Sequence, residues 1–139
     1  MLSADTEIAI QFYDLDPMDV VWHGNYPRFL EQARCALLDR IGYNYAQMKA
    51  SGYAWPIVDM RIRYVRPIIM AERIVVTAKL MEYEHRLKLE YRIRRKAGGE
   101  VLTKAQTVQV AVHMLSGDLL LESPPALTVP VRALLCAAG

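Results

Sequence analysis

Residues 25–42 read NYPRFLEQARCALLDRIG, and this segment sets the architecture of the chain. Its apolar residues recur at steps of three and four, while most of its charged residues fall elsewhere on the helical wheel. This spacing predicts an amphipathic helix of about four turns. Asn25 is the expected N-cap, Pro27 suits the first turn, and Gly42 supplies a left-handed stop. The apolar stripe consists of Tyr26, Phe29, Leu30, Ala33, Leu37 and Ile41.

Local patterns continue on both sides of this helix. Residues 6–13 alternate in polarity, with Ile8, Ile10 and Phe12 on one face, so we expect a first strand there. Immediately after the long helix, residues 44–50 predict a short second helix that ends at the next glycine.

The alternating pattern in the rest of the chain predicts a series of consecutive strands. Paired glycines near residue 98 are typical of a tight hairpin, because such turns require positive φ angles. The last long strand should keep Val108, Val110, Val112 and Met114 on one side. The expected strands after the helices are 58–64, 74–80, 87–93 and the one that ends near Met114.

One long helix and one sheet predict an α+β fold, with the helix wrapped by a curved antiparallel sheet of about five strands. We expect one domain over residues 1–139, with its core in about 7–123 and an apolar tail, 124–139. The outer edges of such a sheet would expose unpaired backbone groups. The chain is therefore expected to form a homodimer through edge pairing or sheet packing.

Composition narrows the functional classes. Hydrophobic residues make up 53% and charged residues 23% of the chain, which is typical of a compact globule. A net charge of +2 is too small for a dedicated nucleic-acid binder. We see no secretory leader and no apolar run long enough to span a bilayer. The two cysteines, Cys35 and Cys136, have no metal-site spacing, so we expect a cytoplasmic protein without a bound metal.

The densest reactive segment directly precedes the long helix. It contains the acids Asp14, Asp16 and Asp19, followed by His23. A helix N-terminus presents unpaired amides and partial positive charge, which can stabilise a developing oxyanion. This layout suits an acyl transfer whose leaving group departs readily, and a thioester qualifies because a thiol has a pKa near ~8.5. The sequence contains no GxSxG, HExxH or P-loop pattern.

Three motifs carry a resemblance to a known family. Asp14–Asp16 reads DLD, residues 20–26 read VVWHGNY, and residues 29–34 read FLEQAR. In this order and spacing they resemble the hotdog-fold acyl-CoA thioesterases of the 4-hydroxybenzoyl-CoA thioesterase type. The resemblance implies a hotdog fold that assembles as a homodimer or homotetramer, with active sites between subunits. It implies no cofactor and a substrate carried by coenzyme A or an acyl carrier protein.

The resemblance also assigns roles to individual positions. It implies that Asp16 is the catalytic carboxylate, as nucleophile or as general base, and that the backbone amide of His23 polarises the thioester carbonyl. Glu31 matches an acid that positions the attacking water in relatives. Relatives usually carry a small residue followed by glycine where Met18 and Asp19 stand here, so this loop departs from the family pattern.

Substrate contacts are expected from several further segments. The residues around His23, namely Trp22, Gly24 and Tyr26, belong to the segment at the start of the helix. Trp55, Pro56 and Asp59 fall where a strand of the facing subunit closes the acyl pocket in relatives. Arg86 and Lys88 are candidates for binding the phosphates of coenzyme A.

Other interpretations stay open beside these. Asp14 is expected to serve structure rather than chemistry, because an acid at a strand-to-loop junction usually accepts hydrogen bonds from nearby amides. The basic row from Arg86 to Arg94 can be a solvated strand face or, more remotely, a surface for RNA. The alternative to a hydrolase is a noncatalytic acyl-thioester binding or assembly module, if the altered loop has disabled the site.

Overall fold

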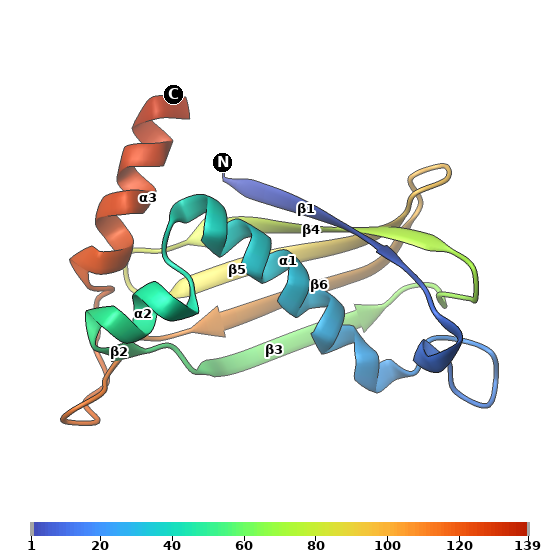
Figure 1. Cartoon of the computed structure of the whole chain (residues 1–139), viewed down its shortest axis with the longest axis horizontal. Helices are drawn as coiled ribbons and strands as arrows, with labels where there is room; N and C mark the ends of the chain where they lie inside the picture. The colour runs from blue at the N-terminus through green and yellow to red at the C-terminus, as the bar shows by residue number, and fades with distance from the viewer. Residues whose placement is uncertain (1, 139) are drawn as a thin grey trace.

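The computed structural model describes residues 2–138, so the two ends of the predicted domain, residues 1 and 139, lie outside it. One long helix, α1 (Tyr26–Ile41), lies across one face of a twisted five-stranded antiparallel sheet (Figure 1). The expected α+β hotdog architecture is confirmed. In spatial order the strands are β1 (Ser3–Ala9), β4 (Arg73–Glu82), β5 (Leu87–Arg95), β6 (Val101–Gln109) and β3 (Ile57–Tyr64).

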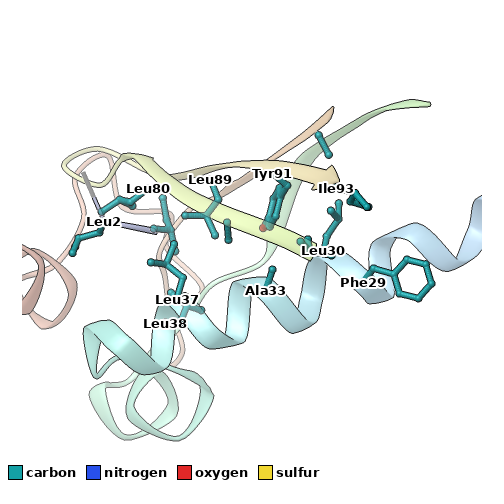
Figure 2. Close-up of a cluster of buried hydrophobic side chains, with 14 of the residues drawn as sticks. Leu2, Phe29, Leu30, Ala33, Leu37, Leu38, Leu80, Leu89, Tyr91 and Ile93 are labelled. Carbon is teal, nitrogen blue, oxygen red and sulfur yellow. The ribbon is translucent and has the colours of Figure 1, made fainter. Parts of the chain in front are cut away.

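The apolar stripe of α1 forms the centre of the core. Phe29, Leu30, Ala33 and Leu37 are each at most 1% exposed, and they face the inward side chains of the sheet (Figure 2). Burying each of the large side chains contributes about 1.5–3 kcal/mol relative to leaving it in water. The sheet contributes Leu80, Leu89, Tyr91 and Ile93 to this cluster.

The two ends of α1 differ from each other in how well the sequence predicts them. Gly42 ends the helix with φ +83°, and its amide bonds to the carbonyls of Leu38 and Asp39, as expected for a left-handed stop. Asn25, by contrast, makes no side-chain cap. Its side-chain amide donates instead to the carbonyl of Asp14 at 2.9 Å, because a 3-10 turn, η2 (His23–Asn25), already leads into the helix.

The shorter elements complete the molecule. The predicted second helix is confirmed as α2 (Tyr45–Ser51), and two short strands, β2 (Tyr53–Ala54) and β7 (Val112–His113), form a separate small sheet. The last helix, α3 (Pro125–Ala138), packs beside α1 and contributes Leu127 and Val131 to the core. No helix within residues 2–138 combines the length and the apolar character that crossing a membrane requires.

The first strand ends earlier than the alternation predicts. β1 stops at Ala9, and Phe12 lies in a 3-10 turn, η1 (Phe12–Asp14), with 72% of its surface exposed. The reason is local, since the carboxylate of Asp14 accepts a hydrogen bond from the Gln11 amide at 2.8 Å and turns the chain. The prediction that Phe12 continues the buried face was therefore wrong.

The later strands also depart from a simple succession. The predicted strand through Met114 breaks after Gln109, whose side chain donates to the carbonyl of Trp55 at 2.8 Å, and β7 then pairs with β2. β3 does not pair with the next strand along the chain. It pairs with β6, which makes β3 one edge of the sheet.

This edge strand is the most exposed strand of the large sheet. Val58, Met60 and Tyr64 are 57%, 37% and 48% exposed, although alternation predicted that their face is buried. Period-two spacing shows which residues share a face but not whether another element covers that face. An exposed apolar edge strand is a ready template for pairing with another chain.

Candidate active site

The loop that carries Asp16 is held in one conformation by three hydrogen bonds. The Asp16 amide donates to the Val20 carbonyl at 2.8 Å, and the Asp19 amide donates to the Asp16 carbonyl at 3.0 Å. Asp16 Oδ1 accepts from the Met18 amide at 2.8 Å. Among residues 2–138, Asp16 Oδ2 has no protein donor, which leaves it available to a ligand or water.

Asp19 adopts the backbone conformation that glycine favours. Its φ is +62°, in the left-handed region that aspartate tolerates better than most residues. The departure from the family pattern at Met18 and Asp19 therefore keeps a closed turn beneath Asp16.

Asp14 braces this loop against the start of α1. It is only 3% exposed, and its two carboxylate oxygens accept from Arg28 at 2.6 Å and from the Gln11 amide at 2.8 Å. Its carbonyl accepts from the Trp22 amide at 3.0 Å and from the side chain of Asn25. Asp14 thus links η1, η2 and the helix, in line with the structural role expected for it.

The start of α1 offers free backbone donors. The 3-10 turn at His23–Asn25 uses the Asn25 amide, which donates to the Trp22 carbonyl at 2.9 Å. The amides of His23 and Gly24 make no backbone hydrogen bond to any of the described residues. Helix N-termini also carry partial positive charge. These two amides can therefore stabilise an oxyanion.

Gly24 has room for a side chain only if the ring of Trp22 moves. The ring of Trp22 lies across it, so a Cβ at this position would come within 2.5 Å of ring carbons. The ring of Trp22 also lies 5.4 Å from that of His23, centroid to centroid. The expected segment Trp22, His23, Gly24 and Tyr26 is thus a compact unit at the helix start.

Asp16 and His23 line the same cavity, of about 290 Å³. The Tyr64 hydroxyl, from the end of β3, donates to the His23 carbonyl at 3.1 Å and fixes that turn to the sheet. Burial raises the pKa of Tyr26 to about 12, so its phenol remains protonated at neutral pH. The cavity is lined by Asp16, Val20, Val21, His23, Tyr26, Tyr64, Val65, Arg66 and Pro67.

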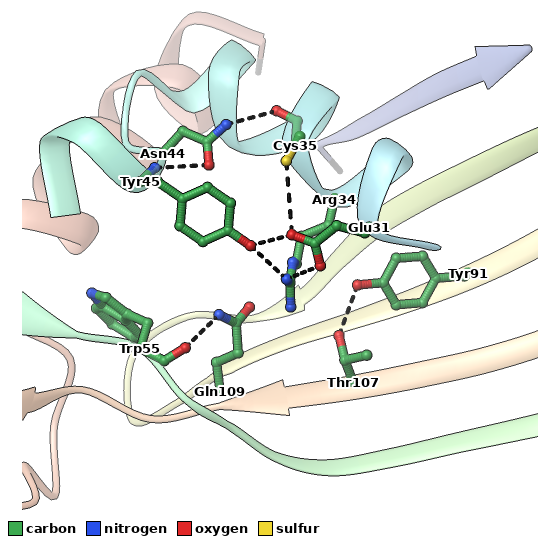
Figure 3. A network of polar contacts seen from close by, with 9 residues as sticks. All are labelled: Glu31, Arg34, Cys35, Asn44, Tyr45, Trp55, Tyr91, Thr107 and Gln109. Carbon is green, nitrogen blue, oxygen red and sulfur yellow. Dashed lines mark hydrogen bonds and ion pairs between the residues drawn. The ribbon is translucent and has the colours of Figure 1, made fainter. Parts of the chain in front are cut away.

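Glu31 lies further along α1, in a separate polar cluster (Figure 3). Its carboxylate accepts from the guanidinium of Arg34 and from the Tyr45 hydroxyl, and the Cys35 thiol lies 3.9 Å from it. Burial alone would raise the pKa of Glu31, but the hydrogen bonds from Arg34 and Tyr45 outweigh it and hold the pKa below its ordinary value. Glu31 is not among the residues that line the Asp16 cavity.

The remaining predicted contacts lie at the opposite end of the sheet. Trp55, which is 8% exposed, and the exposed Pro56 precede β3, and Asp59 lies near its start. Lys88 is paired with Val108 near one end of β6, whereas Tyr64 of the cavity is paired with Thr103 near the other end of the same strand. Within one protomer these residues are therefore not brought to Asp16. Arg86 forms an ion pair with Glu82 at 2.9 Å.

Sequence reasoning missed Tyr64, Arg66 and Arg28. Alternation places Tyr64 on the inward face of its strand, but only the register of the sheet brings it beneath His23. Arg66 lines the cavity and forms an ion pair with Glu100 at 2.5 Å. No short motif marks such pairings. Across residues 2–138, no three or more His, Cys, Asp or Glu side chains form a group that could hold a metal ion.

Comparison with known proteins assigns the family. The model of the Thioesterase-like superfamily matches residues 10–131. The chain belongs to the Thioesterase-like superfamily. This superfamily match includes the Asp16 loop, α1 and the whole of β3–β6.

Individual relatives agree with this assignment. YneP of Bacillus subtilis, provisionally named an acyl-CoA thioesterase, is 32% identical over 107 residues, which cover 76% of this chain and 77% of YneP. The 1,4-dihydroxy-2-naphthoyl-CoA hydrolase of Thermosynechococcus vestitus is 28% identical over 79% of this chain and 76% of its own. The solved DHNA-CoA thioesterase of Staphylococcus aureus superposes with a TM-score of 0.83 at 24% identity, covering 100% of this chain and 97% of that one. This last likeness concerns the fold.

Proposed function

We propose that the protein hydrolyses an acyl thioester, carried by coenzyme A or an acyl carrier protein, to a free acid and a thiol. The observation that carries this proposal is the shared cavity of Asp16 and His23 at the start of α1. One carboxylate oxygen of Asp16 has no protein donor, and the amides of His23 and of the adjoining Gly24 have no backbone acceptor among the described residues, which supports the proposal. The superfamily, and the coenzyme A thioesters named for YneP and the Thermosynechococcus hydrolase, support the same reaction class.

In this proposal the thioester carbonyl oxygen accepts hydrogen bonds from the amides of His23 and Gly24. Asp16 either attacks the carbonyl carbon, giving an anhydride that water opens, or removes a proton from the water that attacks. In both routes the carbon–sulfur bond breaks and the sulfur leaves as thiolate, which needs no strong general acid. Tyr26 lines the cavity and stays protonated, so its hydroxyl can donate a hydrogen bond to the substrate.

The noncatalytic alternative rested on a disabled loop at Met18 and Asp19. The left-handed conformation of Asp19 is the one that a glycine would favour at this position, which supports an intact loop and favours the hydrolase over the binder. The hydrogen bond from the Met18 amide to Asp16 Oδ1 further holds the carboxylate beside the cavity.

We also propose that the site is completed in a homodimer through β3. Antiparallel pairing of two β3 edges about their middle would align the start of one strand with the end of the other. That would bring Trp55, Pro56 and Asp59 of one protomer to the Tyr64 end of β3 in the second protomer, which borders the cavity. This proposed pairing would account for the expectation that these residues come from a facing subunit.

The test is release of free thiol from a panel of aryl- and fatty acyl thioesters of coenzyme A and of an acyl carrier protein. We expect turnover of at least one member, and a fall in kcat of about 100-fold or more for Asp16→Asn. The matched control is Asp19→Asn, because asparagine also tolerates the left-handed conformation and the charge removed is the same. Equal loss of turnover in both variants, or no release from any thioester, would refute the proposal.

A further inference from the structure

The outward face of three adjacent strands concentrates positive charge. This basic face consists of the side chains of β3, β5 and β6 that alternate with the buried ones such as Leu89, Tyr91 and Ile93, so it lies on the side of the sheet opposite the core and α1. Figure 1 shows these three strands side by side, with α1 across one face of the sheet. It carries six cations against two carboxylates, while the whole chain has a net charge of only +2. The cations are Arg61, Arg63, Lys88, Arg92, Arg94 and Lys104, and the carboxylates are Asp59 and Glu90.

Three of these cations form an uninterrupted row across the strands. Lys104 is paired with Arg92 on one side and with Arg63 on the other, and all three side chains are exposed. Like charges directly opposite each other destabilise a sheet. Among residues 2–138 none of the three has an ion-pair partner. The positive charge of this row is thus not neutralised within the described residues, and an anionic partner would stabilise it.

The basic face is hollowed, and the hollow and the Asp16 cavity are lined by consecutive residues of β3 and of the segment that follows it. A depression of about 280 Å³ is lined by Arg61, Arg63 and Lys104, together with Glu90. The residues that follow Arg63 on the chain, up to Pro67, line the Asp16 cavity. At a rise of about 3.3 Å per residue, only about 10 Å of extended chain separates Arg63 from Arg66. A phosphopantetheine arm spans more than this.

The pattern of charge favours a protein over a nucleotide or a second copy of the chain. The cations are spread over strands about 4.8 Å apart, wider than the phosphates of one nucleotide, and Glu90 and Asp59 would repel a continuous phosphate backbone. A face with this excess of one sign does not pack against itself. A protein surface rich in carboxylates, with occasional cations, complements it.

We propose that the basic face is the docking surface for an acidic acyl carrier protein, whose phosphopantetheine arm delivers the thioester to the Asp16 cavity. This inference rests on the proposed hydrolase function and selects between its two kinds of substrate. Acyl carrier proteins are small acidic proteins that present the arm from their surface, so docking within reach of the cavity meets both requirements.

The test compares one acyl group on three carriers: an acyl carrier protein, coenzyme A and N-acetylcysteamine. The variants are Lys104→Glu and Arg63→Glu, with Lys49→Glu on the exposed surface of α2 as a control of equal charge change. Lys104→Glu also converts a like-charge row into favourable cross-strand pairs, so it should not unfold the sheet. We expect kcat/KM for the carrier protein to fall about tenfold or more in both variants and to stay within about twofold for N-acetylcysteamine. Lys49→Glu should change neither value.

Other outcomes overturn this inference in distinguishable ways. An equal fall for acyl-coenzyme A would mean that the face binds the phosphates of that molecule, and an unchanged value for the carrier protein would remove the docking role. Salt-sensitive binding of a single-stranded RNA oligomer that Lys104→Glu abolishes, with carrier turnover unchanged, would make the face a nucleic-acid surface. If no carrier supports turnover, the hydrolase proposal fails. Fluorescence anisotropy of a labelled carrier protein then still tests docking. Binding that is lost in Lys104→Glu supports the docking surface, and absence of binding to the wild type refutes it.

Discussion

Asp14 accepts four hydrogen bonds, two through its carboxylate and two through its carbonyl, although it does not line the cavity. Its carboxylate ties Arg28 of α1 to the Gln11 amide, and its carbonyl accepts from the Trp22 amide. Because these bonds join the two ends of the Asp16 loop, we expect Asp14 to influence where Asp16 lies relative to the free amides. We regard it as a positioning residue.

Replacing Asp14 with asparagine should therefore lower kcat with little change in KM. The free energy of unfolding should fall by about 1–3 kcal/mol, because the buried carboxylate loses its charged hydrogen bonds. The loss should not be larger, since the partner Arg28 is 56% exposed and can be solvated by water. Kinetics and denaturant unfolding measured at the same temperature separate the two effects. If Asp14→Asn loses stability but keeps the kcat of the wild type, the positioning role is wrong.

Gly24→Ala tests the geometry of the amides more locally. The added Cβ would meet the ring of Trp22, which is 49% exposed and can move aside. Stability should thus change by about 1 kcal/mol or less, while the near-ultraviolet circular dichroism of Trp22 changes and kcat falls because the displaced ring shifts the turn at His23, against which it packs. An unaltered spectrum together with full activity would contradict this account. The double variant Gly24→Ala/Trp22→Ala, which removes the obstruction, should recover part of kcat.

At the scale of elements, the cluster of Glu31, Arg34 and Tyr45 joins α1 to α2 and should make stability depend on pH. The pKa of Glu31 is lowered in the folded state, so its ionised form stabilises the fold above the unfolded pKa of about 4.3, and this contribution is lost as pH falls through the folded pKa. Because its side chain is 38% exposed, we expect about 1 kcal/mol or less.

Thermal unfolding of Glu31→Gln against wild type between pH 3 and 7 measures this contribution. The stability difference should be largest above about pH 5 and disappear toward pH 3. Glu84→Gln is the control, because Glu84 is exposed and forms no ion pair within residues 2–138. A difference for Glu31→Gln that stays constant across the range would mean that packing, not charge, is responsible.

The elements that sequence predicted well are those with local signals. α1 and α2 each end at a glycine with positive φ, Gly42 and Gly52, and their apolar spacing is regular. The misses concern segments whose conformation depends on distant partners. Phe12 left the strand pattern because Asp14 turned the chain, and the strand toward Met114 broke where Gln109 reached Trp55.

For the whole molecule, the exposed edge at β3 predicts a dimer. Met60→Asp places a charge in that edge and should yield a monomer with much reduced kcat/KM, as measured by light scattering coupled to size-exclusion chromatography and by kinetics. The matched control is Met81→Asp, since Met81 lies on β4, away from this edge, with 38% exposure against 37% for Met60. A wild-type chain that remains monomeric at all concentrations, or an unchanged mass for Met60→Asp, would disprove β3 pairing.

The candidate site was predictable where it lies within one continuous segment. Asp16 and His23 belong to the run before α1, and the structure places them in one cavity. Tyr64 joins them only through the register of the sheet, which alternation does not specify. Arg86 and Lys88 were predicted to bind phosphates from the family resemblance, and in one protomer they lie at the far end of the sheet.

We propose that the carboxylate of Asp16 performs the chemistry, whereas the other residues of the cavity bind the thioester. The most direct measurement is calorimetric binding of a nonhydrolysable thioether analogue, alongside single-turnover hydrolysis, for wild type and Asp16→Asn. We predict that Kd stays within about threefold while the hydrolysis rate falls about 100-fold or more. Hydrolysis that survives in Asp16→Asn, or binding that is lost in the same proportion as the rate, would contradict the account.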